Sequence, residues 1–461
     1  MSKGNYLDSD AETLTERAVR GLAGLFAAHP WFDRGGLHAL ERWYFPLSRL
    51  WAAACEAGGD AARYYDGVPM VGRFEDRARL THALARYEQA RAAATAIETQ
   101  WRATLFGDAR QPAASLKGVE DARLSLRHSF NATRRHFHPL LKRKPPRARV
   151  EIATPGEVES AYGDALLELG PFISAPDPMP EVAVSHAVPS ALGWDRWLTF
   201  QSPARRVGGL VTARVHEPEG VANPPTVIFG HGICVEFDHW RGLIDEVHAL
   251  VREGFRVIRP EAAWHGRRTP QGYYGGERII ATFPAGVLDA LLGAVREWAV
   301  VADWARRTSS GALGFGGSSL GALTAQLAAS LAREWPEPLR PDGLFLVTHA
   351  GDLAHCLASG VLSRVFAGLE EALRVGWRED ELRRYLSLLN PEPAPVVPAS
   401  RIVSILGRRD VVLPFDSGRR LVEDWCLPEA NLFLLDRGHF SVPATLLSDK
   451  RPARRFREVM R

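Results

Sequence analysis

The spacing of apolar residues divides the chain into two parts of different character. Up to about residue 110, apolar positions recur every three or four residues, which is typical of helices with one buried face. From about residue 182, short apolar runs alternate with longer amphipathic segments, a pattern that predicts strands alternating with helices. We therefore expect a helical N-terminal part and an α/β domain built on a mostly parallel sheet.

Three segments of the N-terminal part carry the helical periodicity. They are residues 11–28, 37–57 and 78–105, the last of which is rich in Ala and Arg. We interpret this region as a packing platform or a dimerisation element, so that a homodimer is one arrangement it would allow; a cap over a substrate pocket is the alternative.

A basic stretch at 132–149 separates the two parts. Its arginines and lysines could form a nucleic-acid patch, but it has too few aromatic residues for a stacking platform. We interpret it as a solvated connector. The predicted division is a helical extension with this connector at 1–150 and an α/β domain at 151–461.

Short apolar runs predict the strands of that domain. The runs at 182–188, 194–200 and 208–216 are expected to be antiparallel lead-in strands. The later runs, which helical segments separate, are expected to pair in parallel. They are 226–229, 255–258, 313–316, 344–347, 402–406 and 432–435. The helices expected around them are 239–253, 285–306, 319–333, 351–390, 415–425 and 441–459.

Composition narrows the range of partners and compartments. With 57 Lys and Arg against 54 Asp and Glu, the net charge is only +3, which disfavours nucleic acid or an acidic membrane as the main partner. The four cysteines are scattered, which favours a reducing compartment over a disulfide framework. The N-terminus lacks an apolar signal core, and no long uncharged apolar run appears, so we expect a cytoplasmic protein without stable membrane insertion. Nothing in the sequence indicates a metal or an organic cofactor.

One stretch carries a candidate nucleophile. Residues 317–321 read Gly-Ser-Ser-Leu-Gly, after an apolar run and before a small-residue helix. The G-x-S-x-G pattern resembles the nucleophile elbow of the α/β-hydrolases and makes Ser319 the nucleophile. Glycines two positions before and after it would let strand and helix pass closely. An alternative is a phosphate-binding loop, because Gly314 and Gly316 match half of a G-x-G-x-x-G pattern.

The resemblance covers roughly 185–461 and implies an eight-stranded sheet with a triad in the chain order Ser, acid, His. Asp410 follows the run at 402–406, and His439 follows the last run at 432–435. We expect His439 to take the proton of Ser319 and Asp410 to orient the imidazole. Asp352, after the run at 344–347, is the rival acid.

The resemblance also implies an oxyanion hole of two backbone N–H groups. One would be that of Leu320, next after the nucleophile. The other would come from Gly230-His231-Gly232-Ile233, which resembles the His-Gly motif of the superfamily. We assign it to Ile233, with Gly232 as a close rival, and expect His231 to brace the loop.

A second turn, Glu261 to Arg268, resembles a turn of dienelactone-hydrolase-like esterases. One interpretation places His265 and Arg268 at the mouth of the substrate pocket, where Arg268 could contact a carboxylate. The other, which we favour, is a structural turn with its own hydrogen-bond network.

Together these features predict a serine hydrolase that cleaves a small-molecule carboxylic ester through an acyl-enzyme. A helical lid at 351–397 and the helical extension suggest an apolar acyl group. Amide or peptide cleavage, acyl transfer, C–C bond hydrolysis and a catalytically silent binding protein are the alternatives.

Overall fold

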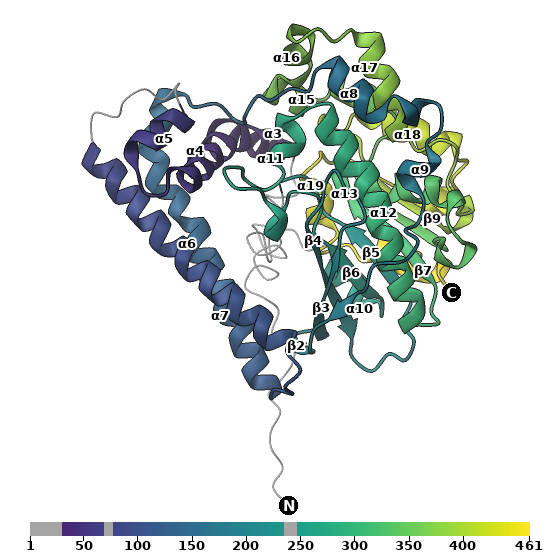
Figure 1. Cartoon of the computed structure of the whole chain (residues 1–461). Helices are drawn as coiled ribbons and strands as arrows, with labels where there is room; N and C mark the ends of the chain where they lie inside the picture. The colour runs from purple at the N-terminus through teal and green to yellow at the C-terminus, as the bar shows by residue number, and fades with distance from the viewer. Residues whose placement is uncertain (1–29, 69–76, 235–246) are drawn as a thin grey trace, which may run out of the picture.

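A computed structural model describes residues 30–68, 77–234 and 247–461. Figure 1 shows an α/β body with a long helical arm at one side. The helix predicted at 11–28 lies outside the described residues. So does the first part of the helix predicted at 239–253, whose described part is α10 (Val247–Arg252).

A central sheet of ten strands organises the described part of the chain. The strand order is β1-β3-β4-β6-β5-β7-β8-β9-β10, with β2 also paired to β3. From β6 to β10 all neighbours are parallel, whereas β3 and β4 run antiparallel to each other and β4 runs antiparallel to β6. The strands are β1 (Ala183–Val184), β2 (Val188–Ser190), β3 (Gly193–Gln201), β4 (Leu210–Pro218), β5 (Thr226–Gly230), β6 (Arg256–Pro260), β7 (Leu313–Ser318), β8 (Gly343–Val347), β9 (Ile402–Gly407) and β10 (Leu432–Leu435).

The lead-in region differs from the prediction, because the run at 182–188 forms two short strands and not one. Ser185 still donates its backbone N–H to Trp197 of β3. The N–H of His186 instead reaches the carbonyl of Leu105, at the end of the helical arm. The pairing with β3 is therefore interrupted, and the nine predicted runs form ten strands, two more than the eight that the resemblance implied.

Helices cover both faces of the sheet, which explains why its inner strands are almost wholly apolar. On one face, Ile228 and Phe315 pack in a core with α12 (Ala285–Thr308) and α13 (Leu320–Leu331). On the other face, Val227 and Phe229 pack with α10 and α20 (Arg451–Val459). Successive side chains of β5 point to opposite faces of the sheet, so this strand contributes to two separate cores.

The C-terminal segment forms two helices where one was predicted at 441–459. They are α19 (Ser441–Thr445) and α20. Asp449 accepts a hydrogen bond from the backbone N–H of Arg451, and Pro452 stands in the first turn of α20. A side-chain acceptor followed by proline is a start signal for a new helix.

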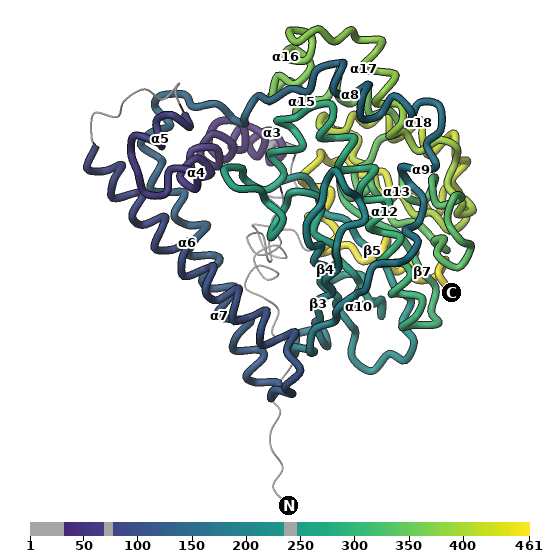
Figure 2. The backbone as a smooth tube through the Cα atoms, viewed as in Figure 1, coloured from purple at the N-terminus to yellow at the C-terminus, as the bar shows by residue number. Residues whose placement is uncertain are grey.

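The segment between β8 and β9 is helical, as predicted for 351–390, and lies over one end of the sheet (Figure 2). It contains α14 (Leu353–Ser359), α15 (Val361–Phe366), α16 (Gly368–Arg374), α17 (Glu379–Leu386) and the short 3₁₀ helix η8 (Ser387–Leu389). The next helix, α18 (Phe415–Asp424), follows β9.

The N-terminal helices form the arm and its junction with the body. The long helices α6 and α7 lie side by side (Figures 1 and 2). The helices are α3 (Pro30–Ala39), the π-helix η1 (Leu40–Tyr44), α4 (Phe45–Ala57), α5 (Ala61–Gly67), α6 (Arg77–Leu105) and α7 (Ala113–Ala132). Their core also contains Cys234, Tyr274 and Val365 of the body, so the junction is a packed interface.

The basic stretch at 132–149 is not the solvated connector that we predicted. Residues Thr133–Arg143 form the 3₁₀ helix η3, and its Phe137 and Leu140 are buried in the core of the arm. The guanidinium of Arg134 stacks over the ring of Trp51 at 4.1 Å. Apolar residues at a spacing of three within the basic run explain this difference, because they give the segment one buried face.

A mostly parallel sheet with antiparallel lead-in strands, helices on both faces and a serine at a strand-to-helix turn is the α/β-hydrolase fold. No helix within the described residues is long and apolar enough to cross a membrane.

Candidate active site

The candidate nucleophile stands on a strained turn. Ser319 has φ 55° and ψ −119°, between the end of β7 and the start of α13. Such a conformation costs a residue with a side chain about 1–3 kcal/mol and persists only where neighbouring structure holds it. Here the backbone N–H of Ser319 donates to the carbonyl of Val347 in β8, and its carbonyl accepts from Leu323 in α13.

Glycines allow this turn to pack against β5. A Cβ at Gly321 would lie 2.0 Å from the carbonyl carbon of Gly230, and one at Gly317 would lie 2.3 Å from the carbonyl carbon of Gly321. The end of β5, the turn and the start of α13 are therefore in backbone contact. The two glycines of the G-x-S-x-G pattern are required by this contact, as the sequence predicted.

Three residues from separate loops meet at the turn. Nε2 of His439 lies 2.9 Å from Oγ of Ser319, and Nδ1 of His439 lies 2.7 Å from Oδ2 of Asp410. A carboxylate can only accept, so Nδ1 carries the proton and Nε2 is left to accept from the serine hydroxyl. A hydroxyl, an imidazole and a carboxylate therefore lie within hydrogen-bond reach of one another.

Both oxygens of the Asp410 carboxylate accept hydrogen bonds. Its second oxygen, Oδ1, accepts hydrogen bonds from the backbone N–H groups of Val412 and Leu413, both at 2.9 Å. Asp410 is 6% exposed and His439 is 7% exposed. Two backbone donors fix the rotamer of the carboxylate, which in turn fixes the plane of the imidazole.

The rival acid has a different role. Asp352 is the N-cap of α14, where its carboxylate accepts the backbone N–H of His355 at 3.0 Å. Capping a helix is a common structural use of aspartate. Of the two candidate acids, the structure brings Asp410 to the imidazole.

The loop expected to supply an oxyanion donor is held by two histidines. Nδ1 of His231 donates to the carbonyl of Gly232, and Nε2 accepts the N–H of Ala262. Burial lowers the pKa of His231 well below its usual value, so the ring remains neutral. This is the bracing role that the sequence suggested for His231. Ile233 lines the same cavity as Ser319 and Leu320.

His265 belongs to the same brace and not to a substrate mouth. Its Nε2 accepts the backbone N–H of Cys234 at 2.9 Å, and its Nδ1 lies 2.9 Å from the carbonyl of Ala263. The side chain is 1% exposed. Both ring nitrogens are used by backbone groups, which leaves the imidazole no donor or acceptor for a ligand.

Arg268 is also structural. Its guanidinium forms a buried ion pair with Glu297, with contacts of 2.7 and 2.9 Å, and donates to the carbonyl of Gly208. The interpretation that placed Arg268 near a substrate carboxylate is corrected by these contacts, because the protein already supplies that carboxylate.

Ser319 lines an apolar cavity of about 140 Å³. Five regions form its wall: the loop at 230–233, the segment from α11 (Glu277–Ala281) to α12, the turn into α13, the helices between β8 and β9, and the loop after β9. The residues from these regions include Ile233, Ile279, Phe283, Leu291, Leu353, Leu357, Leu362, Phe366 and Leu369. Residue spacing does not reveal these individual residues, because a leucine that lines a cavity has the same helical spacing as one in a solid core.

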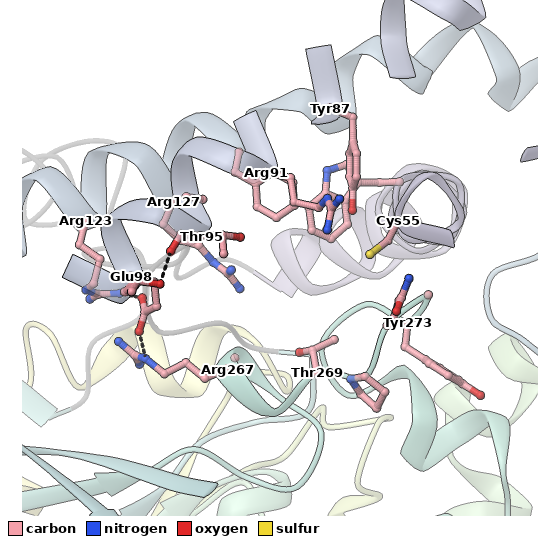
Figure 3. A pocket seen from close by; sticks show the side chains of 18 of the residues that line it. Cys55, Tyr87, Arg91, Thr95, Glu98, Arg123, Arg127, Arg267, Thr269 and Tyr273 are labelled. Atoms are coloured by element: carbon pink, nitrogen blue, oxygen red, sulfur yellow. Dashed lines mark hydrogen bonds and ion pairs between the residues drawn. The ribbon is translucent and has the colours of Figure 1, made fainter. Parts of the chain in front are cut away.

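A second, more polar cavity of about 460 Å³ lies between the arm and the turn at 266–273 (Figure 3). Glu98 of α6 pairs with Arg267 of the body at 2.5 Å and with Arg123 of α7 at 3.7 Å, so the first ion pair ties the arm to the body and the second ties α6 to α7. Although it is larger, this cavity is lined by neither Ser319 nor His439. Ser319 lines the smaller cavity instead.

Comparisons with known proteins identify no family for this chain. No family model matches the chain, and no curated protein matches its sequence. Acetyl xylan esterase 1 from Thermoanaerobacterium sp. is 15% identical, with a TM-score of 0.41 over 65% of this chain and 97% of that one. An acetyl xylan esterase from Paenibacillus sp. is 16% identical, with a TM-score of 0.40 over 63% and 92%. An esterase from Pyrobaculum calidifontis is 16% identical, with a TM-score of 0.35 over 66% and 90%. The fold assignment rests on the strand order and the turn at Ser319.

Proposed function

We propose that the protein is a serine hydrolase that cleaves carboxylic esters of small apolar acids through an acyl-enzyme. One observation carries the proposal: Oγ of Ser319 lies in the wall of an apolar cavity, 2.9 Å from an imidazole nitrogen that the other contacts of the ring leave free to accept a proton. A nucleophile, a base and an orienting acid within hydrogen-bond reach are the requirement for nucleophilic catalysis of this kind.

In the proposed first half-reaction, Oγ of Ser319 attacks the ester carbonyl carbon while Nε2 of His439 takes the hydroxyl proton. The negative charge that develops on the carbonyl oxygen would be held by the N–H groups of Leu320 and Ile233. Each such donor is worth about 10²–10³ in kcat in well-studied hydrolases. His439 then returns the proton to the leaving alcohol, and the acyl group remains on Ser319.

In the second half-reaction, His439 would remove a proton from water, which attacks the acyl carbon and releases the acid. Asp410 would stay ionised throughout and stabilise the imidazolium that forms in both steps. The same base acts twice, so any displacement of His439 should slow acylation and deacylation alike.

The cavity limits the acyl group. Its volume of about 140 Å³ is close to the roughly 150 Å³ of an engineered apolar cavity that admits benzene. Its walls offer almost only hydrocarbon, which disfavours charged or heavily hydroxylated acyl groups. We propose short to medium, unbranched or aromatic acyl groups, with the alcohol portion outside the cavity.

The test is covalent labelling by a fluorophosphonate, read by intact mass, with the Ser319→Ala variant as control. The proposal predicts one adduct on the wild type and none on the variant. Hydrolysis of 4-nitrophenyl esters of increasing chain length should then give the highest kcat/KM at short to medium chains. Wild-type protein that neither reacts with the probe nor hydrolyses any ester would refute the proposal. A diketone panel and an alcohol acceptor would separate C–C bond hydrolysis and acyl transfer from ester hydrolysis.

A further inference from the structure

The loop that carries His439 is held by a residue from the far end of the chain. Asp33 of α3 accepts the backbone N–H of Phe440 at 2.7 Å and that of Ser441 at 3.2 Å. Its other oxygen accepts the hydroxyl of Ser441 at 2.5 Å. Asp33 and Phe440 are 407 positions apart in sequence.

These bonds clamp the loop on both sides of the histidine. The hydroxyl oxygen of Ser441 also accepts the backbone N–H of Gly438 at 3.0 Å, so one carboxylate controls residues 438, 440 and 441. A Cβ at Gly438 would lie 2.5 Å from the carboxyl carbon of Asp33, so the loop approaches Asp33 closely. A three-point attachment around a single residue leaves its backbone little freedom to move.

The same helical segment contacts the other parts of the candidate site. The hydroxyl of Tyr44 donates to the carbonyl of Cys234, at the end of the oxyanion loop. The ring of Phe45 packs edge-on against Phe366, which lines the apolar cavity, at a centroid distance of 4.7 Å. The segment at 33–45 therefore contacts the loop of His439, the end of the loop at 230–234 and the helices over the cavity.

A buried ion pair fixes this segment to the body. Nη1 of Arg49 in α4 lies 2.9 Å from Oε1 of Glu277 and donates to the carbonyl of Gly272. The side chains of Arg49 and Glu277 are 1% and 0% exposed. Arg49 lies one helical turn after Phe45, so this ion pair anchors the segment at 33–45 to the body. The segment therefore cannot shift relative to the candidate site without breaking the ion pair.

We infer that the N-terminal helical segment is part of the active site, and that Asp33 is a positioning residue that aims His439 at Ser319. The inference rests on the proposed function, because it assigns a task to the imidazole. A mispositioned base costs turnover steeply: a displacement of about 1 Å can cost about 100-fold. Substrate binding would be little affected, since Asp33 acts on the histidine loop and not on the cavity wall.

The experiment compares Asp33→Ala and Asp33→Asn in the full chain. We expect Asp33→Ala to lower kcat and the fluorophosphonate labelling rate by about 10–100-fold, with KM within about two-fold of wild type. Asp33→Asn should recover most of the rate, because its amide oxygen still accepts the N–H of Phe440. The KM and kcat results separate a positioning role from general destabilisation.

Asp60→Ala is the matched control. Asp60 lies in the same helical region and accepts two backbone N–H groups at the start of α5, but it caps its own helix and not the histidine loop. Its removal should lower thermal stability and leave the labelling rate within about two-fold of wild type. Equal losses from Asp60→Ala and Asp33→Ala would overturn the inference.

Ser441→Ala keeps the test decisive if Asp33→Ala does not fold. It removes the bond to Oδ2 of Asp33 and the link to Gly438, and we expect a smaller loss of labelling rate, about 5–10-fold, at unchanged KM. Wild-type labelling rates in Asp33→Asn, Ser441→Ala and any folded Asp33→Ala would refute the inference and leave the proposed function standing. A wild-type protein without reactivity would refute the proposed function itself.

Discussion

Oδ2 of Asp410 and Nδ1 of His439 lie 2.7 Å apart, although the two residues follow different strands, β9 and β10. The parallel pairing of these strands places their carboxyl ends at one edge of the sheet, and Ser319 follows β7 at the same edge. The geometry at the histidine is therefore a direct consequence of the sheet register. The roles of the Asp410 and Asp352 carboxylates can therefore be tested separately by mutation.

Asp410→Asn should lower kcat/KM by about 10³–10⁴ while the protein remains folded. The amide oxygen would stay with the N–H groups of Val412 and Leu413, and the amide nitrogen would face the imidazole. That arrangement favours the tautomer protonated on Nε2, which cannot accept the serine proton. Asp352→Asn is the matched control and should change kcat/KM less than about three-fold. If Asp352→Asn produced the large loss instead, the role of acid would pass to Asp352.

Gly321→Ala should prevent correct folding of the turn at Ser319. The added methyl group would lie 2.0 Å from backbone atoms of Gly230, which cannot move aside as a flexible side chain can. We expect a loss of stability of about 3 kcal/mol or more and no fluorophosphonate adduct. Gly118→Ala, at an exposed site in α7 where a Cβ meets nothing within 4 Å, should instead stabilise the protein by about 0.5–1 kcal/mol. A Gly321→Ala protein with wild-type melting temperature and labelling would contradict the observed contact.

Leu357→Ala should shift the acyl-chain preference toward longer esters. Leu357 lines the cavity from α14, and its truncation removes three carbon atoms from the wall. The optimum chain should lengthen by about three carbons, with kcat/KM for the longer ester rising by about ten-fold. Leu373→Ala, at an exposed position of α16, should leave the chain-length profile unchanged. Identical profiles for both variants would show that the acyl group binds elsewhere.

Arg268→Met should destabilise the protein without altering KM. It leaves the carboxylate of Glu297 buried without its main partner, which costs about 3–5 kcal/mol. The double variant Arg268→Met/Glu297→Met should recover part of that loss, because an apolar pair of similar volume can replace a buried ion pair. Melting temperatures and KM for a 4-nitrophenyl ester are the measurements. An increase in KM at unchanged stability would restore Arg268 to the substrate mouth.

Acidification should weaken the fold through His349, at the end of β8. Burial lowers the pKa of His349 to about 3, and its Nε2 lies 2.7 Å from the hydroxyl of Ser404. The unfolded chain takes up a proton near pH 6.5 and the folded one only near pH 3, so stability falls as the pH drops from 6.5 toward 3. At pH 5 the contribution of this residue is a loss of about 2 kcal/mol relative to pH 7.

The check is the urea midpoint at pH 7 and pH 5 for wild type and His349→Gln. Glutamine retains a hydrogen-bonding group but does not titrate, so the variant should be less stable at pH 7 and lose less stability on acidification. An equal loss in both proteins would show that other groups set the acid sensitivity.

Sequence alone was sufficient for the strands from β3 to β10, and it pointed to three residues at the ends of strands. Strands such as β5 and β9 are short apolar runs bounded by turn residues, and such runs are visible without knowledge of their neighbours. The G-x-S-x-G pattern around Ser319 is visible in the sequence, although the contact that requires Gly321 is with Gly230 of β5. Asp410 and His439 could be chosen because each follows a predicted strand, and parallel strands bring their ends together.

Only the tertiary structure decided how the remaining residues are used. His265 and Arg268 stand in a motif that suggests a ligand site, yet backbone groups and Glu297 satisfy them, and hydrogen-bond partners distant in sequence leave no local pattern. The contact of Asp33 with the loop of His439 spans nearly the whole chain. An aspartate near the start of a helix reads as an ordinary favourable charge there, because periodicity and propensity report only interactions within one element. Which element packs against which is fixed by the complementary shapes of buried faces, and these exist only once the chain has folded.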